Sequence, residues 1–70
     1  MKHYYINNTT KNPNGNNEVH TEDCRYLPSL TNRTCLGYFT DGIAAVAAAK
    51  AKGYSKADGC IHCCPEAHRE

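Results

Sequence analysis

Two short clusters of metal-binding side chains constrain this chain more than any other feature. The first is His20-x3-Cys24 and the second is Cys60-x2-Cys63. A zinc ion takes four nitrogen and sulfur ligands in a tetrahedron, and structural sites usually collect them as two closely spaced pairs. The spacing therefore predicts one domain closed around one Zn²⁺ ion, with His20, Cys24, Cys60 and Cys63 as its metal ligands.

The chain is short enough for a bound metal to decide its stability. At 70 residues, only about 60% of the surface of the unfolded chain can be buried, so a single core is marginal. The large aliphatic and phenylalanine side chains are few: Ile6, Val19, Leu27, Leu30, Leu36, Phe39, Ile43, Val46 and Ile61. Small domains of this kind commonly rely on disulfides or a structural metal. We expect the bound metal to stabilise the fold.

The cysteine count argues against a disulfide framework. Five cysteines are an odd number, and the first residues lack the apolar region of a secretory signal. A reducing, cytoplasmic setting is expected instead. No apolar run approaches the roughly 20 residues needed to cross a bilayer, so no membrane partner is expected.

The net charge says little about the kind of partner that the chain binds. The formal charge is +1, and one Zn²⁺ with three thiolates would bring it to about zero. Lys50, Lys52 and Lys56 near one helix end, and Arg25 and Arg33 near the first cluster, are interpreted as solvated surface charges. A local basic patch stays open as an alternative, because affinity for nucleic acid depends on clustered phosphate contacts.

The N-terminal part of the chain predicts a β-hairpin. Residues 3–7 are aromatic and β-branched enough for a strand, and residues 12–15, Asn-Pro-Asn-Gly, are a strong turn signal. The second strand is expected over residues 18–20, where it would carry His20 to the first cluster.

The remainder predicts a third strand and one helix. Residues 35–39 form the strand, and the alanine-rich residues 42–52 form the helix. Thr40 or Asp41 can cap its start, Gly53 suits the position after its end, and the side chains expected to face the sheet are Ile43, Val46 and Ala47. Residues 53–59 are expected to form a loop, and Pro65 could start a short helix through Ala67. The expected fold is one α+β domain over residues 1–70, with a short antiparallel sheet of about three strands packed by one main helix.

Other cysteines and histidines compete for the ligand positions. Cys64 neighbours Cys63, and adjacent side chains point apart, so we expect it to be buried or free. Cys35 is expected to be a small core residue, and His62 is expected to point outward. His68 is the strongest rival to His20, because a terminal turn could fold it back to the site.

The order of these motifs carries a family resemblance. The run Val19-His20-x3-Cys24-Arg25-Tyr26-Leu27, an alanine-bearing helix ending in Gly53-Tyr54, and then Cys60-x2-Cys63 resembles the zinc-binding N-terminal domain of the Ada DNA-repair methyltransferase and small bacterial Ada-like modules. The likeness covers residues 18–65 and implies a compact zinc domain. Ada accepts a methyl group on a zinc-bound cysteine at the position of His20. The histidine here does not carry that activity over, although Cys24 could react instead.

The same residues suit some functions better than others. Redox catalysis by Cys-x2-Cys would require a βαβ context that the pattern lacks. A zinc hydrolase would keep an open coordination position, which three cysteines and a histidine would fill. The leading hypothesis is a structural zinc module, not an enzyme, that binds nucleic acid or protein as a monomer, with no small-molecule substrate. The alternative is a thiolate-reactive protein, either an alkyl-group acceptor or a redox or metal sensor.

Overall fold

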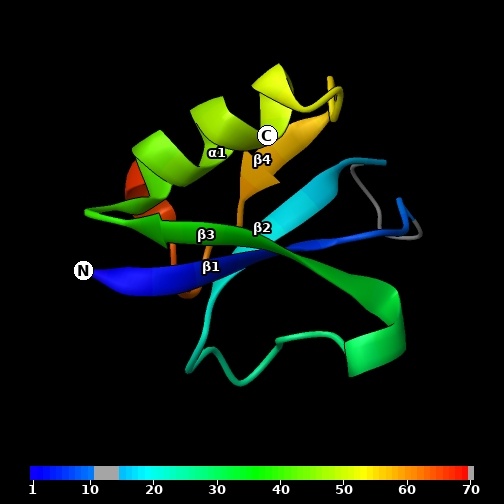
Figure 1. Cartoon of the computed structure of the whole chain (residues 1–70), viewed down its shortest axis with the longest axis horizontal. Helices are drawn as coiled ribbons and strands as arrows, with labels where there is room; N and C mark the ends of the chain where they lie inside the picture. The colour runs from blue at the N-terminus through cyan, green and yellow to red at the C-terminus, as the bar shows by residue number, and fades with distance from the viewer. Residues whose placement is uncertain (11–14, 70) are drawn as a thin grey trace.

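A four-stranded mixed sheet forms the framework of residues 1–10 and 15–69, the part of the chain that the computed structural model describes. The strands lie in the order β3-β1-β2-β4 (Figure 1). Their bounds are Lys2–Asn7 (β1), Asn17–Thr21 (β2), Arg33–Phe39 (β3) and Ala57–Gly59 (β4). β1 runs antiparallel to β2 and β3, whereas β4 runs parallel to β2. With one helix on this sheet, the α+β class is confirmed.

The predicted hairpin is formed by β1 and β2. Tyr5 pairs with His20, and Ile6 pairs with Val19. Because successive side chains of a strand point to opposite faces, Ile6 and Val19 enter the core together, and both are fully buried. Most of the turn predicted at residues 12–15 lies outside the described residues. Gly15, its last residue, has a φ of 67°, a value that glycine adopts readily.

β3 carries a bulge opposite β1. Tyr4 pairs with Gly37 but Tyr5 pairs with Cys35, so Leu36 is an extra residue in the ladder. Gly37 has a φ of 124°, which lets the strand bend at the bulge. Leu36 is buried, whereas Cys35 is exposed on this edge strand. The prediction of Cys35 as a core residue was therefore wrong, because Leu36 takes the inward position.

Helix α1, Gly42–Ala51, covers one face of the sheet and contacts all four strands (Figure 1). Asp41 caps it, as predicted, by accepting a hydrogen bond from the Ala44 N–H at 2.9 Å. Gly53 follows its end with a φ of 105°.

The face that α1 turns to the sheet differs from the prediction. The buried helix residues are Gly42, Ala45 and Ala49, and only Val46 of the predicted set packs partly against the core. Ile43 is 50% exposed. Small side chains face the sheet because the helix lies close to the segment after β4: a Cβ on Gly42 would lie 3.0 Å from Cys64 Cβ.

The strand β4 is also a correction, because residues 57–59 were predicted as part of a loop. All three residues are buried, and they pair with residues 17–19 of β2. A strand of three residues that includes aspartate and glycine has too little β propensity to be recognised from the sequence. These residues form a strand because β2 offers them hydrogen bonds.

Two irregular segments complete the fold. Residues 22–32, which include the 3₁₀ turn Leu30–Asn32 (η1), lie on the side of the sheet opposite α1 (Figure 1). Arg33 holds them there, because its guanidinium stacks 4.7 Å from the Tyr5 ring centroid and donates to the Pro28 carbonyl at 3.1 Å. The turn predicted at Pro65 is the 3₁₀ helix Pro65–Ala67 (η2). Within the described ranges, no helix has the length and apolar character to cross a membrane.

Candidate metal centre

The two predicted pairs meet because β4 lies parallel to β2. His20 is the fourth residue of β2, and Cys24 follows β2 in a turn. Cys60 comes directly after β4, and its N–H donates to the Val19 carbonyl at 2.9 Å. The end of β4 therefore lies beside His20, and the turn that follows brings in Cys63.

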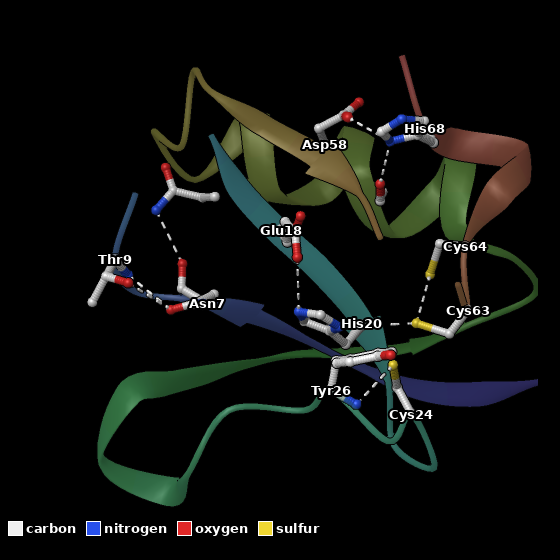
Figure 2. A network of polar contacts seen from close by, with 12 residues as sticks. Asn7, Thr9, Glu18, His20, Cys24, Tyr26, Asp58, Cys63, Cys64 and His68 are labelled. Carbon is white, nitrogen blue, oxygen red and sulfur yellow. Dashed lines mark hydrogen bonds and ion pairs between the residues drawn. The ribbon is translucent and has the colours of Figure 1, made fainter. Parts of the chain in front are cut away.

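The four donors form one cluster. One ligand atom from each of His20, Cys24, Cys60 and Cys63 lies within 4.8 Å of every other. The His20 Nδ1 and the Cys63 Sγ are 4.0 Å apart (Figure 2). His20 and Cys60 are buried, whereas Cys24 and Cys63 are half-buried. These four residues lie close enough to hold one metal ion.

A carboxylate that was not among the predicted site residues lies beside the imidazole of His20. Its Nδ1 faces the cluster, while its Nε2 lies 3.6 Å from Glu18 Oε1 (Figure 2). Metal-bound histidines usually direct the second ring nitrogen to such a group. Glu18 precedes His20 by two residues, so both side chains leave the same face of β2. This two-residue spacing is the sequence signal from which Glu18 could have been predicted as part of the site.

The protonation state of His20 also suits metal binding. Its side chain is 2% exposed, and burial lowers the pKa of the imidazole below its usual 6.5. Burial disfavours the charged form of a histidine. His20 is therefore neutral at neutral pH, which is the form that binds a metal.

Backbone amides point at two of the sulfurs. The Thr21 N–H donates to Cys63 Sγ at 3.3 Å. The Tyr26 N–H donates to Cys24 Sγ at 3.4 Å (Figure 2). The Tyr26 bond favours the thiolate form of Cys24. Burial nevertheless raises the pKa of the Cys24 thiol, with the Tyr26 amide opposing that rise. A cation between the sulfurs would supply the charge that keeps Cys24 ionised.

The Cys60-x2-Cys63 turn depends on the glycine before it. The Cys64 N–H donates to the Cys60 carbonyl at 2.7 Å and closes the turn. A Cβ on Gly59 would lie 2.7 Å from the Cys64 carbonyl oxygen and 2.8 Å from Ala67 Cβ. Close approach of neighbouring groups, more than unusual backbone angles, therefore requires glycine at position 59.

The predicted alternative ligands lie outside this cluster. Cys64 was predicted to be either buried or free. It is fully buried, and burial raises the pKa of its thiol far above the usual range. His62 is exposed, as predicted, and stacks on Tyr26 with 4.5 Å between ring centroids. His68, the predicted rival of His20, instead directs Nδ1 to the Gly59 carbonyl at 3.0 Å and to Asp58 Oδ2 at 3.2 Å (Figure 2). His68 fastens the C-terminal segment to β4.

A shallow hollow of about 350 Å³ opens beside the cluster. Cys24 and Cys63 line it together with Lys2, Arg25 and His62. Lys2 pairs with Asp23 at its rim, at 2.8 Å between Nζ and Oδ2. Two of the four donors are thus accessible from one side, while His20 and Cys60 are enclosed.

The fold and the cluster define a small α+β domain with a candidate metal centre. No protein-family model matches the chain, and no curated protein or solved structure shows significant similarity to it. Its function must therefore be inferred from the residues of the site and their geometry.

Proposed function

We propose that this chain is a small structural zinc module in which His20, Cys24, Cys60 and Cys63 bind one Zn²⁺ ion. The convergence of four donors within 4.8 Å, from two pairs that lie far apart in the sequence, is the observation that carries the proposal. A tetrahedral zinc site with Zn–S bonds of about 2.3 Å has sulfur–sulfur edges of about 3.8 Å. The cluster needs only a small contraction to reach that geometry.

The donor types favour zinc and a structural role. Thiolates select soft or borderline metals, and a set of three sulfurs and one nitrogen is typical of zinc. Four protein ligands leave no open position for a water molecule or a substrate. Zinc would supply charge neutralisation and a cross-link, and the residues themselves would hold β2, β4 and the two turns in place.

The size of the core supports the need for such a cross-link. Among the large apolar side chains in the described part of the chain, only Tyr4, Ile6, Val19 and Leu36 are buried, and much of the remaining core is alanine and cysteine. At about 25 cal/mol per Å² of apolar area, so small a core gives a marginal fold. Metal binding in small modules supplies on the order of 10 kcal/mol at neutral pH. Three thiolate ligands also require a reducing compartment, which is why a cytoplasmic location is part of the proposal.

The proposed role of the module is to bind another macromolecule, protein or nucleic acid, as a monomer. Exposed side chains support a binding role: Tyr26 is 52% exposed and stacks on the exposed His62 near the metal centre, and Ile61 is 56% exposed between Cys60 and His62. Aromatic residues are enriched in protein interfaces and serve as stacking platforms for nucleic-acid bases. The proposal also includes a relationship to Ada-like zinc domains, which is supported only by the order of the motifs in residues 18–65.

A thiolate-reactive protein is the second candidate function. The observation that favours it is the access of Cys24 and Cys63 to the hollow. Alkylation of the zinc-loaded protein separates the two functions. Resistance of all three metal-bound thiols, followed by several adducts after chelation, supports the structural role. Rapid labelling of a single cysteine with zinc present supports reactive chemistry.

Intact mass tests the zinc proposal directly. The protein is isolated without added metal, and its mass under native conditions is compared with its mass after acid denaturation. A difference of one zinc ion supports the proposal. Equal masses, or a loss of paired hydrogens relative to the reduced chain, would overturn it in favour of disulfide chemistry.

A further inference from the structure

Cys64 is buried beside the metal centre without belonging to it. Its side chain has no exposed surface, and its Sγ lies 3.8 Å from the Cys63 Sγ (Figure 2). The two adjacent side chains were expected to point apart, but the turn after Cys60 brings their sulfurs into contact. The cluster of four donors, defined over the described residues, does not include Cys64. A thiol with no role as a ligand therefore touches one of the four candidate ligands.

The two neighbouring sulfurs differ in their access to solvent. Cys63 lines the open hollow, whereas Cys64 lies behind it against the start of α1, where a Cβ on Gly42 would be 3.3 Å from the Cys64 Sγ. Cys60, the other ligand of this turn, is only 2% exposed. A small reagent that enters the hollow therefore meets Cys63, or Cys24 in the same lining, before it meets Cys64 or Cys60.

We propose that Cys63 and Cys64 are a redox-sensitive pair, in which hydrogen peroxide converts the ligand Cys63 into a disulfide with Cys64 and so releases the metal. This inference rests on the proposed zinc function. It gives Cys64 a chemical role in addition to its place in the core.

The reaction proceeds in two balanced steps. The Cys63 thiolate attacks one peroxide oxygen, an S–O bond forms, the O–O bond breaks, and hydroxide leaves and takes a proton from the solvent. The Cys64 sulfur then attacks the Cys63 sulfenic acid. The S–S bond forms, the S–O bond breaks, and the departing hydroxyl leaves as water with the Cys64 proton. The two sulfurs lose two electrons in total, and one peroxide becomes two waters.

Closing this bond requires movement within one turn of the chain. A disulfide has an S–S length of about 2.05 Å, so the sulfurs must approach by about 2 Å from their present 3.8 Å separation. The Cα atoms of adjacent residues are about 3.8 Å apart, closer than in most disulfides, and such a bond is strained and readily reduced. The switch is therefore reversible by cellular thiols.

The disulfide removes one ligand from the metal. The product leaves His20, Cys24 and Cys60 as donors, and the cluster loses one of its three thiolates. A site with two thiolates and one imidazole holds zinc more weakly, because less negative charge faces the cation. The metal then dissociates.

The experiment follows zinc release from the zinc-loaded full chain after hydrogen peroxide is added, with a chromogenic chelator as the readout. Wild type is compared with Cys64→Ala and with the matched control Cys35→Ala, which removes an exposed cysteine on β3. Loss of the adjacent resolving thiol is expected to slow release about tenfold, since proximity accelerates the second step. The control is expected to release zinc at the wild-type rate.

Mapping the product provides a test that does not depend on any variant. Remaining thiols are alkylated, the chain is cleaved after its lysines and arginines, and fragmentation of the peptides that contain cysteine locates the disulfide. The expected product joins Cys63 to Cys64, with Cys24 and Cys60 alkylated. A disulfide from Cys63 to Cys24 or Cys60 would overturn the inference, as would equal release rates for wild type and a folded Cys64→Ala variant. A native protein that carries no zinc would overturn the proposed function itself.

Discussion

The backbone N–H of Cys60 donates a 2.9 Å hydrogen bond to the carbonyl of Val19, the residue before His20. This bond continues the parallel pairing of β4 with β2. It sets the second metal-binding pair beside the first, although the two are far apart in the sequence. The candidate metal centre therefore depends on a strand of three residues, Ala57–Gly59.

Loss of one buried ligand is expected to unfold the protein. Cys60→Ser removes a thiolate from a site whose metal contributes on the order of 10 kcal/mol to folding, more than a domain of this size can lose. We expect no bound zinc by native mass and no cooperative transition in urea followed by circular dichroism. Cys35→Ser, at an exposed position, should keep both. A cooperative, zinc-free fold in Cys60→Ser would contradict the structural role of the metal.

Glu18 is expected to strengthen metal binding through His20. Glu18→Ala removes the carboxylate that lies 3.6 Å from His20 Nε2, and loss of such a group typically weakens metal affinity about 10- to 100-fold. Competition with a chelator of known affinity measures the change. Glu22→Ala is the matched control, because its carboxylate bonds to His3 and lies outside the donor cluster. Equal losses in both variants would argue for a general charge effect.

Gly59→Ala is expected to destabilise the protein by about 1–3 kcal/mol, the usual cost of overpacking. The added Cβ would lie 2.7 Å from the Cys64 carbonyl oxygen and push the Cys60-x2-Cys63 turn away from His20. Gly53→Ala has open space around its Cβ, so it should lose less, chiefly through its φ of 105°. Urea unfolding of the zinc-loaded variants measures both. A smaller loss at Gly59 than at Gly53 would rule out crowding as the cause.

Acid is expected to destabilise the protein through His20. Burial lowers the folded-state pKa of this imidazole, whereas the unfolded chain has the usual 6.5. The unfolded state therefore binds more protons as pH falls below 6.5, so the stability contributed by neutral His20 is present above that pH and lost below it. Protonation of the thiolates also releases zinc. Zinc release and unfolding should therefore coincide in an acid titration, and a fold that persists after zinc leaves would contradict this coupling.

Much of the local structure could be predicted from the sequence. The hairpin strands, the Asp41 cap, the glycine after α1 and the turn at Pro65 follow from short-range rules of side-chain shape and hydrogen bonding. The two metal-binding pairs could also be recognised, because their spacing is set by what a single turn can bring to one ion.

Tertiary structure decided the rest. The strand Ala57–Gly59 forms because β2 offers it hydrogen bonds, and the helix turns alanines to the sheet because it packs closely against the segment at Cys64. Each outcome depends on how the folded chain brings its elements together. Local composition determined which elements could form and which side chains could bind a metal, whereas packing determined which faces met and so where the donors converged.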